Sequence, residues 1–301
     1  MKIAVSAASS QLGHAVLHEL LSLADAGNIV AIARTPAKVD MPGIEKRAGD
    51  YTSLESMAEA LSGIDTLVII SAPVGDWDRV AMHRNVIRAA ERAGVRKVIF
   101  TSVVGNAKVQ ETWFWNTQQP SRQVEDELRA SGLQWVVARN GLYLEKDLRH
   151  IILASKAGVY RNIAGDGVCG YITIGELACA LARLALDDRN NGKVLNLVGE
   201  DLTQARLVAL ANEVYGLNVC YETITDEENI AALMKDEKIA KRGVEVAKML
   251  TGCFQCVRIG AFDVPSGFEQ AAGRPVKSTR EMMEGLREQF AAELSSVADH
   301  A

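Results

Sequence analysis

The sequence has little of what marks several large classes of protein. Its 301 residues include only five cysteines, an odd and scattered set that excludes a disulfide framework. Its longest apolar runs, such as residues 66–74, fall far short of the roughly 20 residues that span a bilayer. No signal-peptide core follows the lysine near the N-terminus. We therefore expect a cytoplasmic protein without a membrane partner.

Basic clusters and metal-ligand patterns are also scarce. The formal net charge is −5 and no Lys/Arg cluster stands out, so we expect no nucleic-acid partner. Cys253 and Cys256 are spaced as CxxC, but no second CxxC or histidine pair completes a zinc site. His14 and His18 share a helix face without a carboxylate partner. We predict no metal, and cysteines that are free, buried or half-buried thiols.

What the sequence does contain is an alternation of short apolar runs and helical patterns through its first two-thirds. Several runs are unbroken Val/Ile/Leu, which is typical of parallel strands covered on both faces. The predicted strands are residues 3–6, 29–33, 45–48, 66–70, 97–101, 135–138 and 194–197. The predicted helices among them are residues 11–23, 53–61, 78–93 and 121–131, the last two ending at Gly94 and Gly132 in left-handed caps. This alternation predicts an α/β fold, a Rossmann-type doubly wound parallel sheet.

The first predicted strand runs through a tight turn into the first helix, where such folds seat the pyrophosphate of a dinucleotide. Two positions at which this turn would carry glycine hold Ala7 and Ser10, and only Gly13 remains to let helix pack on strand. A Cβ at Ala7 is costly if its φ is positive, and Ser10 places a side chain near the phosphates. Either the hydroxyls of Ser6, Ser9 and Ser10 donate to the phosphates, or dinucleotide binding is weakened or lost.

The second half of the chain has a different pattern. Helical stretches dominate after about residue 198, and we predict helices over residues 203–215, 226–234, 239–250 and 278–290. We predict an NAD(P)-binding Rossmann-like domain over residues 1–197, partly interleaved with a smaller, mostly helical C-terminal lobe over residues 198–301. The lobe should lie over the carboxyl ends of the strands, where open α/β sheets bind ligands.

Arg34 follows the second predicted strand, at the position that distinguishes the two nicotinamide dinucleotides. An acidic residue there binds the ribose 2′-hydroxyl of NAD, whereas an arginine accommodates the 2′-phosphate of NADP. With Lys38 nearby and no acidic residue in place, the sequence predicts NADP(H) in preference to NAD(H). The alternative is that Arg34 is a solvated surface residue.

Further motifs complete a pattern over roughly residues 1–290. They are Gln11–Gly13, Ala31–Arg34, Pro36–Lys38, Gly49–Tyr51, His83–Asn85, Ala93–Val95, Thr101–Ser102, Arg139–Tyr143 and Ala164–Gly167. In this order the chain resembles the NmrA-like branch of the atypical short-chain dehydrogenases, near the type 2 quinone oxidoreductases and triphenylmethane reductases. Besides Arg34 and Lys38, the predicted cofactor contacts, several of them implied by this resemblance alone, are Ser6, Ala7, Ala8, Ser9, Ser10, Gln11, Leu12, Asp50, Tyr51, Ser71, Ala72, Pro73, Arg139, Asn140 and Gly141.

The catalytic residues are harder to assign. Ordinary short-chain dehydrogenases use Tyr-x-x-x-Lys, in which the lysine lowers the tyrosine pKa, but no tyrosine here has a lysine four residues later. By the resemblance, Ser102 takes the catalytic-serine position, and Ser121 stands where related reductases carry lysine or histidine. Tyr143 is predicted as a proton donor or nicotinamide contact, or alternatively as packing beneath the cofactor.

The aromatic segment Trp113, Phe114 and Trp115 predicts a flat pocket wall for a small-molecule substrate, together with Tyr143 and with Trp77 as a partner. The alternative is a loop packed onto the C-terminal lobe or buried in a homodimer interface. Quinone reduction does not demand a strong side-chain acid, because water can protonate the product of hydride transfer.

The leading hypothesis is therefore an NAD(P)H-dependent oxidoreductase that transfers a hydride to a quinone or other planar, electron-poor molecule. Its main alternative is a non-catalytic NmrA-type regulator that binds a dinucleotide or another ligand and signals through a partner surface. Ala7, Ser10 and Ser121 favour that alternative, whereas Arg34 and residues 139–143 favour the enzyme. A lyase or isomerase without redox chemistry is a third alternative.

Overall fold

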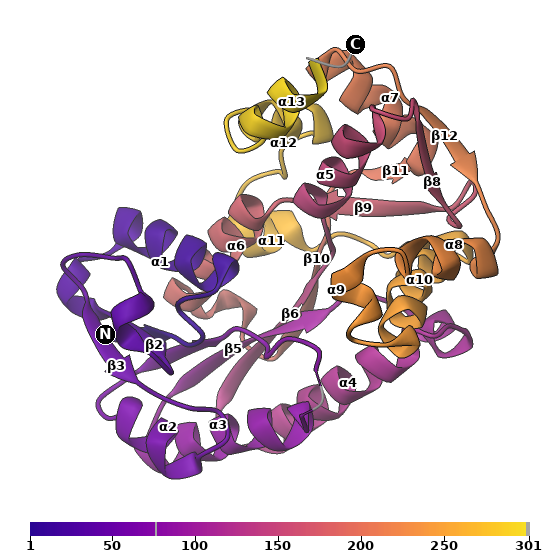
Figure 1. Ribbon diagram of the computed structural model, residues 1–301. Helices are drawn as coiled ribbons and strands as arrows, with labels where there is room; N and C mark the ends of the chain where they lie inside the picture. Colours follow the sequence, from indigo (N-terminus) through magenta and orange to yellow (C-terminus); the bar gives the residue numbers. More distant parts are fainter. Residues whose placement is uncertain (76, 299–301) are drawn as a thin grey trace.

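The computed structural model describes residues 1–75 and 77–298. Its centre is a seven-stranded parallel sheet in the order β10-β6-β5-β4-β1-β2-β3 (Figure 1). The strands are β1 (Ile3–Val5), β2 (Ile29–Ala33), β3 (Glu45–Ala48), β4 (Thr66–Ile69), β5 (Lys97–Val103), β6 (Gln134–Asn140) and β10 (Lys193–Leu197). The predicted Rossmann-type doubly wound fold is confirmed, and each predicted strand is present to within a few residues.

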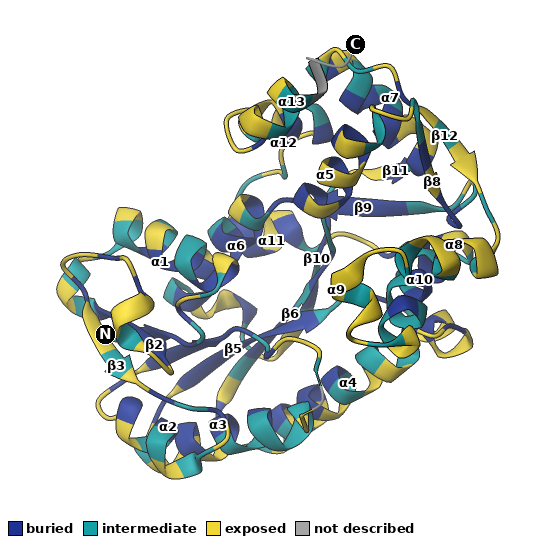
Figure 2. Ribbon diagram, viewed as in Figure 1, coloured by how far each residue is buried: buried dark blue, intermediate teal, exposed yellow. Residues whose placement is uncertain are grey.

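Helices cover both faces of this sheet, which is why most of its strands are buried, as in β1, β2 and β4, whereas the edge strand β3 is charged and largely exposed. One face carries α1 (Gln11–Leu23), α6 (Ile174–Leu186) and α11 (Phe268–Ala272), and the other α2 (Leu54–Ala60), α3 (Arg79–Ala93) and α4 (Trp115–Ala130). Ile3 and Val5 of β1 pack into the first of these cores and Ala4 into the second. Figure 2 shows the sheet buried between the two helical layers.

A second lobe is assembled from three segments of the chain. The first contains β7 (Leu142–Tyr143), α5 (Leu144–Ala154), β8 (Val159–Asn162) and β9 (Val168–Ile172). The second contains β11 (Asp201–Thr203), α7 (Gln204–Tyr215), β12 (Cys220–Thr223), α8 (Asp226–Leu233), α9 (Glu237–Ala240) and α10 (Val244–Arg258). The third contains α12 (Thr279–Gly285) and α13 (Ala291–Ala298). Between these segments the chain returns to the central sheet as α6, β10 and α11.

The second lobe holds more strand than its sequence suggested, because small sheets β11-β9-β7 and β12-β8 join its segments. It begins as early as Leu142, well before residue 198. The division of the chain at residue 197 into folding units stays a prediction. Four short 3-10 helices, η1 (Ala26–Asn28), η2 (Pro36–Lys38), η3 (Ala107–Glu111) and η4 (Asp188–Asn190), lie in the connections.

Three predicted helix ends need correction. Helix α4 begins at Trp115 rather than at residue 121 and contains Pro120, which costs it one hydrogen bond shortly after its first turn. The helix predicted over residues 239–250 is broken at Gly243, whose φ is +88°. Gly94 caps α3 with the predicted left-handed backbone, but α4 ends at an extended Ser131 and Gly132 has no positive φ.

Because the seven central strands are parallel, their carboxyl ends meet at one edge of the sheet, on the side of the second lobe (Figure 1). The strand order reverses between β1 and β4, the place where doubly wound sheets bind ligands. Among the helices of residues 1–75 and 77–298, none has the length and hydrophobicity to cross a membrane.

Candidate functional site

The turn from β1 to α1, residues 6–10, has the backbone of a phosphate-binding turn. Ala7 has a φ of +48° and is the one non-glycine residue with a positive φ in the described part of the chain. This backbone conformation favours glycine, so the Cβ of Ala7 makes it sterically costly. Gly13 packs against it, since a Cβ on Gly13 would lie 2.5 Å from the Ala7 carbonyl oxygen. We call this segment the α1 turn.

Ser10 serves the helix as its N-cap. With a φ of −78° it needs no glycine backbone, and its Oγ accepts a hydrogen bond from the Gly13 N–H at 3.1 Å. The N–H groups of Ser9, Gln11 and Leu12 have no acceptor among the described residues. Free N–H groups at a helix N-terminus attract anions, so the α1 turn fits a pyrophosphate even though Ser10 occupies one donor.

Ser6 and Tyr51 lie beneath the α1 turn rather than open to it. The Ser6 Oγ lies 2.5 Å from the Tyr51 Oη, and one of the two hydroxyl groups donates to the other. The other hydroxyl's proton is directed to a carbonyl oxygen, since the Val68 oxygen is 3.1 Å from Ser6 Oγ and the Ile70 oxygen is 2.9 Å from Tyr51 Oη. Both side chains are buried, and burial raises the pKa of Tyr51. Ser6 is thus engaged inside the protein, which removes its hydroxyl from the phosphate donors considered from the sequence.

The motif His83–Asn85 on α3 holds two loops that the sequence assigned to the cofactor. The Ala72 N–H donates to the His83 Nε2 at 3.0 Å, and the Asn85 amide donates to the Tyr51 carbonyl oxygen at 3.1 Å. Burial, with the charge of Arg79, lowers the pKa of His83 to about 3, so this histidine is a neutral acceptor. The motif therefore positions the ends of β3 and β4 together.

The remaining predicted cofactor residues at this edge have simple surroundings. Arg34 and Lys38 are exposed just beyond β2, and neither forms an ion pair within residues 1–75 and 77–298. Asp50 accepts a hydrogen bond from the Thr52 N–H at 2.9 Å, which closes the loop after β3. The Ser71 N–H donates to the Thr101 Oγ1 at 2.9 Å, joining the ends of β4 and β5. Ala8 and Leu12 are buried, Pro73 is exposed.

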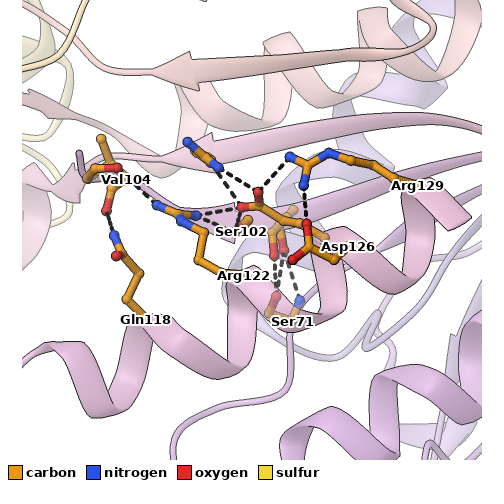
Figure 3. Close-up of polar contacts among 11 residues, drawn as sticks. Ser71, Ser102, Val104, Gln118, Arg122, Asp126 and Arg129 are labelled. Atoms are coloured by element: carbon orange, nitrogen blue, oxygen red, sulfur yellow. Dashed lines mark hydrogen bonds and ion pairs between the residues drawn. The ribbon is translucent and has the colours of Figure 1, made fainter. Parts of the chain in front are cut away.

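A buried carboxylate gathers three arginines at the ends of β5 and β6 (Figure 3). Glu125 of α4 is fully buried and accepts hydrogen bonds from Arg122 at 2.5 Å, Arg139 at 2.6 Å and Arg129 at 3.1 Å. Burial alone would raise the pKa of Glu125, but Arg139, Arg122 and Ser102 hold it below its ordinary value.

This network changes the surroundings of two predicted site residues. The Ser102 hydroxyl donates to the Glu125 Oε1 at 2.6 Å, so it is engaged in the network rather than free for catalysis. The Arg139 guanidinium is likewise turned toward α4, where it forms a two-pronged pair with Glu125. Ser121 is buried on the same helix. No sequence motif pointed to Glu125 as the centre of this network.

At the end of β6 the chain passes from the sheet to the second lobe. A Cβ on Gly141 would lie 3.0 Å from the Gly170 carbonyl oxygen, so a larger residue would crowd this crossing. The Asn140 amide donates to the Tyr143 Oη at 3.4 Å, while the Asn140 Oδ1 is buried with no partner among the described residues. Burial raises the pKa of Tyr143, which makes its phenol a weaker proton donor than an ordinary tyrosine.

The aromatic segment is divided between packing and exposure. Phe114 is buried and meets Phe262 edge to face, with ring centroids 5.6 Å apart, and Trp115 packs against the same core. Both side chains therefore pack α4 against the second lobe, which agrees with the alternative that this segment packs onto the C-terminal lobe. Trp113 is 37% exposed and Trp77 is 49% exposed, so neither side chain is buried in the core.

A cleft of about 970 Å³ opens beside the α1 turn. It is lined by Ser9, Ser10 and Gln11 from the turn and α1, and by Glu145 and Thr173 near the second lobe. Lys38 also lines it, whereas the other predicted cofactor residues and the aromatic segment do not. The sequence missed Glu145, a buried carboxyl on the wall of this cleft. In the described ranges, no group of three or more His, Cys, Asp or Glu could hold a metal.

The reversal of strand order beside a turn with free N–H groups defines a dinucleotide-binding protein of the Rossmann class. A family model described as NAD(P)H-binding matches residues 7–163. The chain belongs to this NAD(P)H-binding, NmrA-like family of oxidoreductases, which confirms the resemblance seen in the sequence motifs.

Three relatives illustrate the likeness. Quinone oxidoreductase 2 of Escherichia coli (strain K12) is 34% identical over 236 residues, 77% of this chain and 80% of that protein. The crystal structure of an NADPH-dependent quinone oxidoreductase from Escherichia coli, complexed with NADPH, matches with a TM-score of 0.84 and 30% identity, covering 94% of this chain and 99% of that one. Triphenylmethane reductase of Citrobacter sp., complexed with NADP(H), matches with a TM-score of 0.84 and 25% identity, covering 95% and 99%.

Proposed function

We propose that this protein binds NADPH and reduces a quinone or another planar, electron-poor small molecule by hydride transfer. The observation that carries the proposal is the α1 turn, where a positive φ at Ala7 and free N–H groups at Ser9, Gln11 and Leu12 fit a pyrophosphate. The substrate class is supported by relatives that are named as a quinone oxidoreductase and a triphenylmethane reductase.

The preference for NADPH over NADH rests on the surroundings of Arg34. Its exposed guanidinium follows β2 and forms no ion pair within the described residues, so it is free to meet a 2′-phosphate. Lys38, four residues further on at the end of η2, adds a second cation near the same edge. No acidic side chain stands at position 34 to accept the ribose hydroxyl of NADH.

The nicotinamide end is assigned from Asn140. Its Oδ1 is buried without a partner in the described part of the chain, and a buried acceptor of this kind costs free energy until a donor reaches it. The carboxamide N–H of a nicotinamide is such a donor. When bound, NADPH supplies the hydride; Asn140 would orient the ring, and the second lobe would exclude water from it.

The test is a titration with NADPH and with NADH followed by nicotinamide fluorescence, and then NADPH oxidation with and without 1,4-naphthoquinone. We expect NADPH to bind more tightly, and quinone to accelerate its oxidation. Arg34→Gln should weaken NADPH binding about tenfold, the loss of one charge-assisted contact, and leave NADH unchanged. Lys46→Gln, an exposed change on β3, is the matched control.

The second candidate function is a non-catalytic regulator, and the surroundings of Ser102 and Ser121 favour it. Ser102 is engaged by Glu125, and α4 presents Ser121 where an acid or base is expected, which suits a protein that binds a dinucleotide without turning it over. Tight NADPH binding with no oxidation by 1,4-naphthoquinone or by a triphenylmethane dye would support this regulator and contradict the reductase. Failure to bind either dinucleotide would contradict both. The cytoplasmic location and the oligomeric state stay predictions.

A further inference from the structure

Glu145 is a buried carboxyl group to which the proposed function has given no role. It lies in the first turn of α5, is 8% exposed, and lines the cleft beside the α1 turn. Ser9, Ser10 and Gln11 line the same cleft from the start of α1. A molecule held in this cleft beside the α1 turn therefore comes within reach of the Glu145 carboxyl group.

The two oxygens of Glu145 have different surroundings. Oε1 accepts a hydrogen bond of 2.7 Å from the N–H of Ile174, the first residue of α6. Oε2 is buried and has no hydrogen-bond partner in the described part of the chain. An ionised oxygen in that position is costly, whereas a carboxylic acid can place its proton there. Burial accordingly raises the pKa of Glu145, and the Ile174 N–H opposes this only in part.

Two neighbouring acids lack this combination of burial and access. Tyr143 has a pKa raised by burial, so its phenol holds its proton more tightly than usual. Asp147, also on α5, is as buried as Glu145, has an unpartnered Oδ2, and has a pKa raised by burial. Asp147 is not among the residues that line the cleft. Of the three, Glu145 alone lines the cleft.

We propose that Glu145 is the proton donor of the reduction, an inference that rests on the proposed function. Bound NADPH would supply the hydride, with its electron pair, that the quinone accepts, and would leave as NADP⁺. The Oε2–H bond of Glu145 breaks, its electron pair stays on the carboxylate, and the proton forms an O–H bond on the quinone oxygen. The product is a neutral hydroquinone. The Ile174 N–H at the N-terminus of α6 stabilises the carboxylate until solvent returns a proton to it.

Other charged groups share the cleft and must be separated from Glu145 in any pH profile. Glu176 of α6 is paired with Arg274 and Lys277, which hold its pKa below the ordinary value against the effect of burial. The rest are His14 and Glu19 on α1, Lys38 and Asp40 near η2, Arg149 on α5 and Glu281 on α12. Because histidine is the side chain that ordinarily changes charge near neutral pH, His14→Gln is included as a control.

The experiment measures kcat against pH for the wild type, Glu145→Gln, Glu145→Asp and Asp147→Asn, with NADPH affinity followed by nicotinamide fluorescence. We expect Glu145→Gln to lower kcat about a hundredfold, the range of general acid catalysis, and to remove the fall of kcat with rising pH. Glu145→Asp should keep that pH dependence, as should Asp147→Asn and His14→Gln. NADPH affinity should change less than twofold in Glu145→Gln. The loss should be larger with tetramethyl-1,4-benzoquinone than with 2,5-dichloro-1,4-benzoquinone, because the reduced oxygen of the former is more basic.

A second readout does not depend on turnover. Infrared spectra near neutral pH should show a neutral-carboxyl band that Glu145→Gln removes and Glu176→Gln leaves in place. If Glu145 only caps α6, Glu145→Gln will lower the melting temperature and leave the pH profile unchanged, which would overturn the inference alone. A wild type that does not oxidise NADPH with either quinone would overturn the proposed function, and the inference with it.

Discussion

The hydroxyl groups of Ser6 and Tyr51 lie 2.5 Å apart beneath the α1 turn. Ser6 follows β1 and Tyr51 follows β3, while the carbonyl oxygens that they bond, of Val68 and Ile70, belong to the end of β4. These polar contacts bring three strand ends together at the point where the strand order reverses. Ser6 and Tyr51, which the sequence predicted as cofactor contacts, both have buried side chains beneath the α1 turn.

This pair should be energetically coupled. Tyr51→Phe and Ser6→Ala each leave a buried polar group short of a partner, so each should lower the free energy of unfolding by about 1–2 kcal/mol. The double variant should lose less than the sum, with a coupling of about 1 kcal/mol in urea denaturation. Additive losses would show that the two hydroxyls act independently.

The backbone of Ala7 predicts an unusual response to glycine. At a φ of +48°, Ala7→Gly relieves strain of about 1 kcal/mol, which offsets the larger entropy of the unfolded glycine chain. The variant should therefore be at least as stable as the wild type. Ala37→Gly, at an exposed alanine of η2 with negative φ, should instead destabilise by about 0.5–1 kcal/mol. Equal losses at both positions in thermal denaturation would contradict the strained turn.

The Ser10 Oγ is predicted to compete with the cofactor phosphates for one hydrogen-bond donor, the Gly13 N–H. Ser10→Gly frees the Gly13 N–H and removes the Cβ, at a cost to α1 of only a few tenths of a kcal/mol. If the freed N–H donates to a phosphate, NADPH should bind roughly tenfold more tightly, which corresponds to about 1.4 kcal/mol. Ser10→Ala frees the donor but keeps the Cβ, so a comparison of the two by fluorescence titration separates hydrogen bonding from crowding. Unchanged affinity in both would disprove competition.

His83 predicts a loss of stability at mildly acidic pH. Its folded pKa of about 3 lies below the ordinary 6.5, so the unfolded chain binds a proton first as the pH falls. The stability from neutral His83 is complete above pH 6.5 and is lost progressively toward pH 3. His83→Gln keeps an acceptor for Ala72 but does not titrate, and should reduce the fall in unfolding free energy between pH 7 and pH 5 by about 2 kcal/mol. An equally steep fall in the variant would contradict a neutral His83.

Glu125 also predicts a loss of stability as the pH falls, but in a lower pH range than His83. Glu125→Gln leaves three guanidinium groups without their carboxylate and should cost about 3 kcal/mol or more near neutral pH. Because the folded pKa of Glu125 is below its ordinary value, its contribution is complete above the ordinary glutamate pKa and is lost as the pH falls below it. The difference between variant and wild type should therefore shrink in acid. Asp126→Asn, an adjacent exposed change, should alter stability little at any pH.

The central sheet could be predicted from the sequence because several of its strands, such as β1, β2 and β4, are unbroken apolar runs between helical patterns. The strands of the second lobe could not, since a segment such as Cys220–Thr223 is mostly exposed and pairs with β8, far away in the chain. The strain at Ala7 and the packing of Gly13 followed from turn chemistry alone. Glu125 and Glu145 were invisible because a glutamate in a helical pattern is normally solvated. Only the tertiary fold brings Arg139 to one and the Ile174 N–H to the other.

The three-segment construction of the second lobe constrains how substrate choice can be transplanted between relatives. A chimera that exchanges only the stretch after residue 198 would leave β7, α5, β8 and β9, with Glu145, in the recipient. The small sheets would then be built from unmatched halves, because β11 pairs with β9 and β12 pairs with β8. A working exchange must move residues 142–172 together with residues 201–258 and 279–298. Substrate selectivity in this fold can therefore be transferred only by exchanging all three segments together.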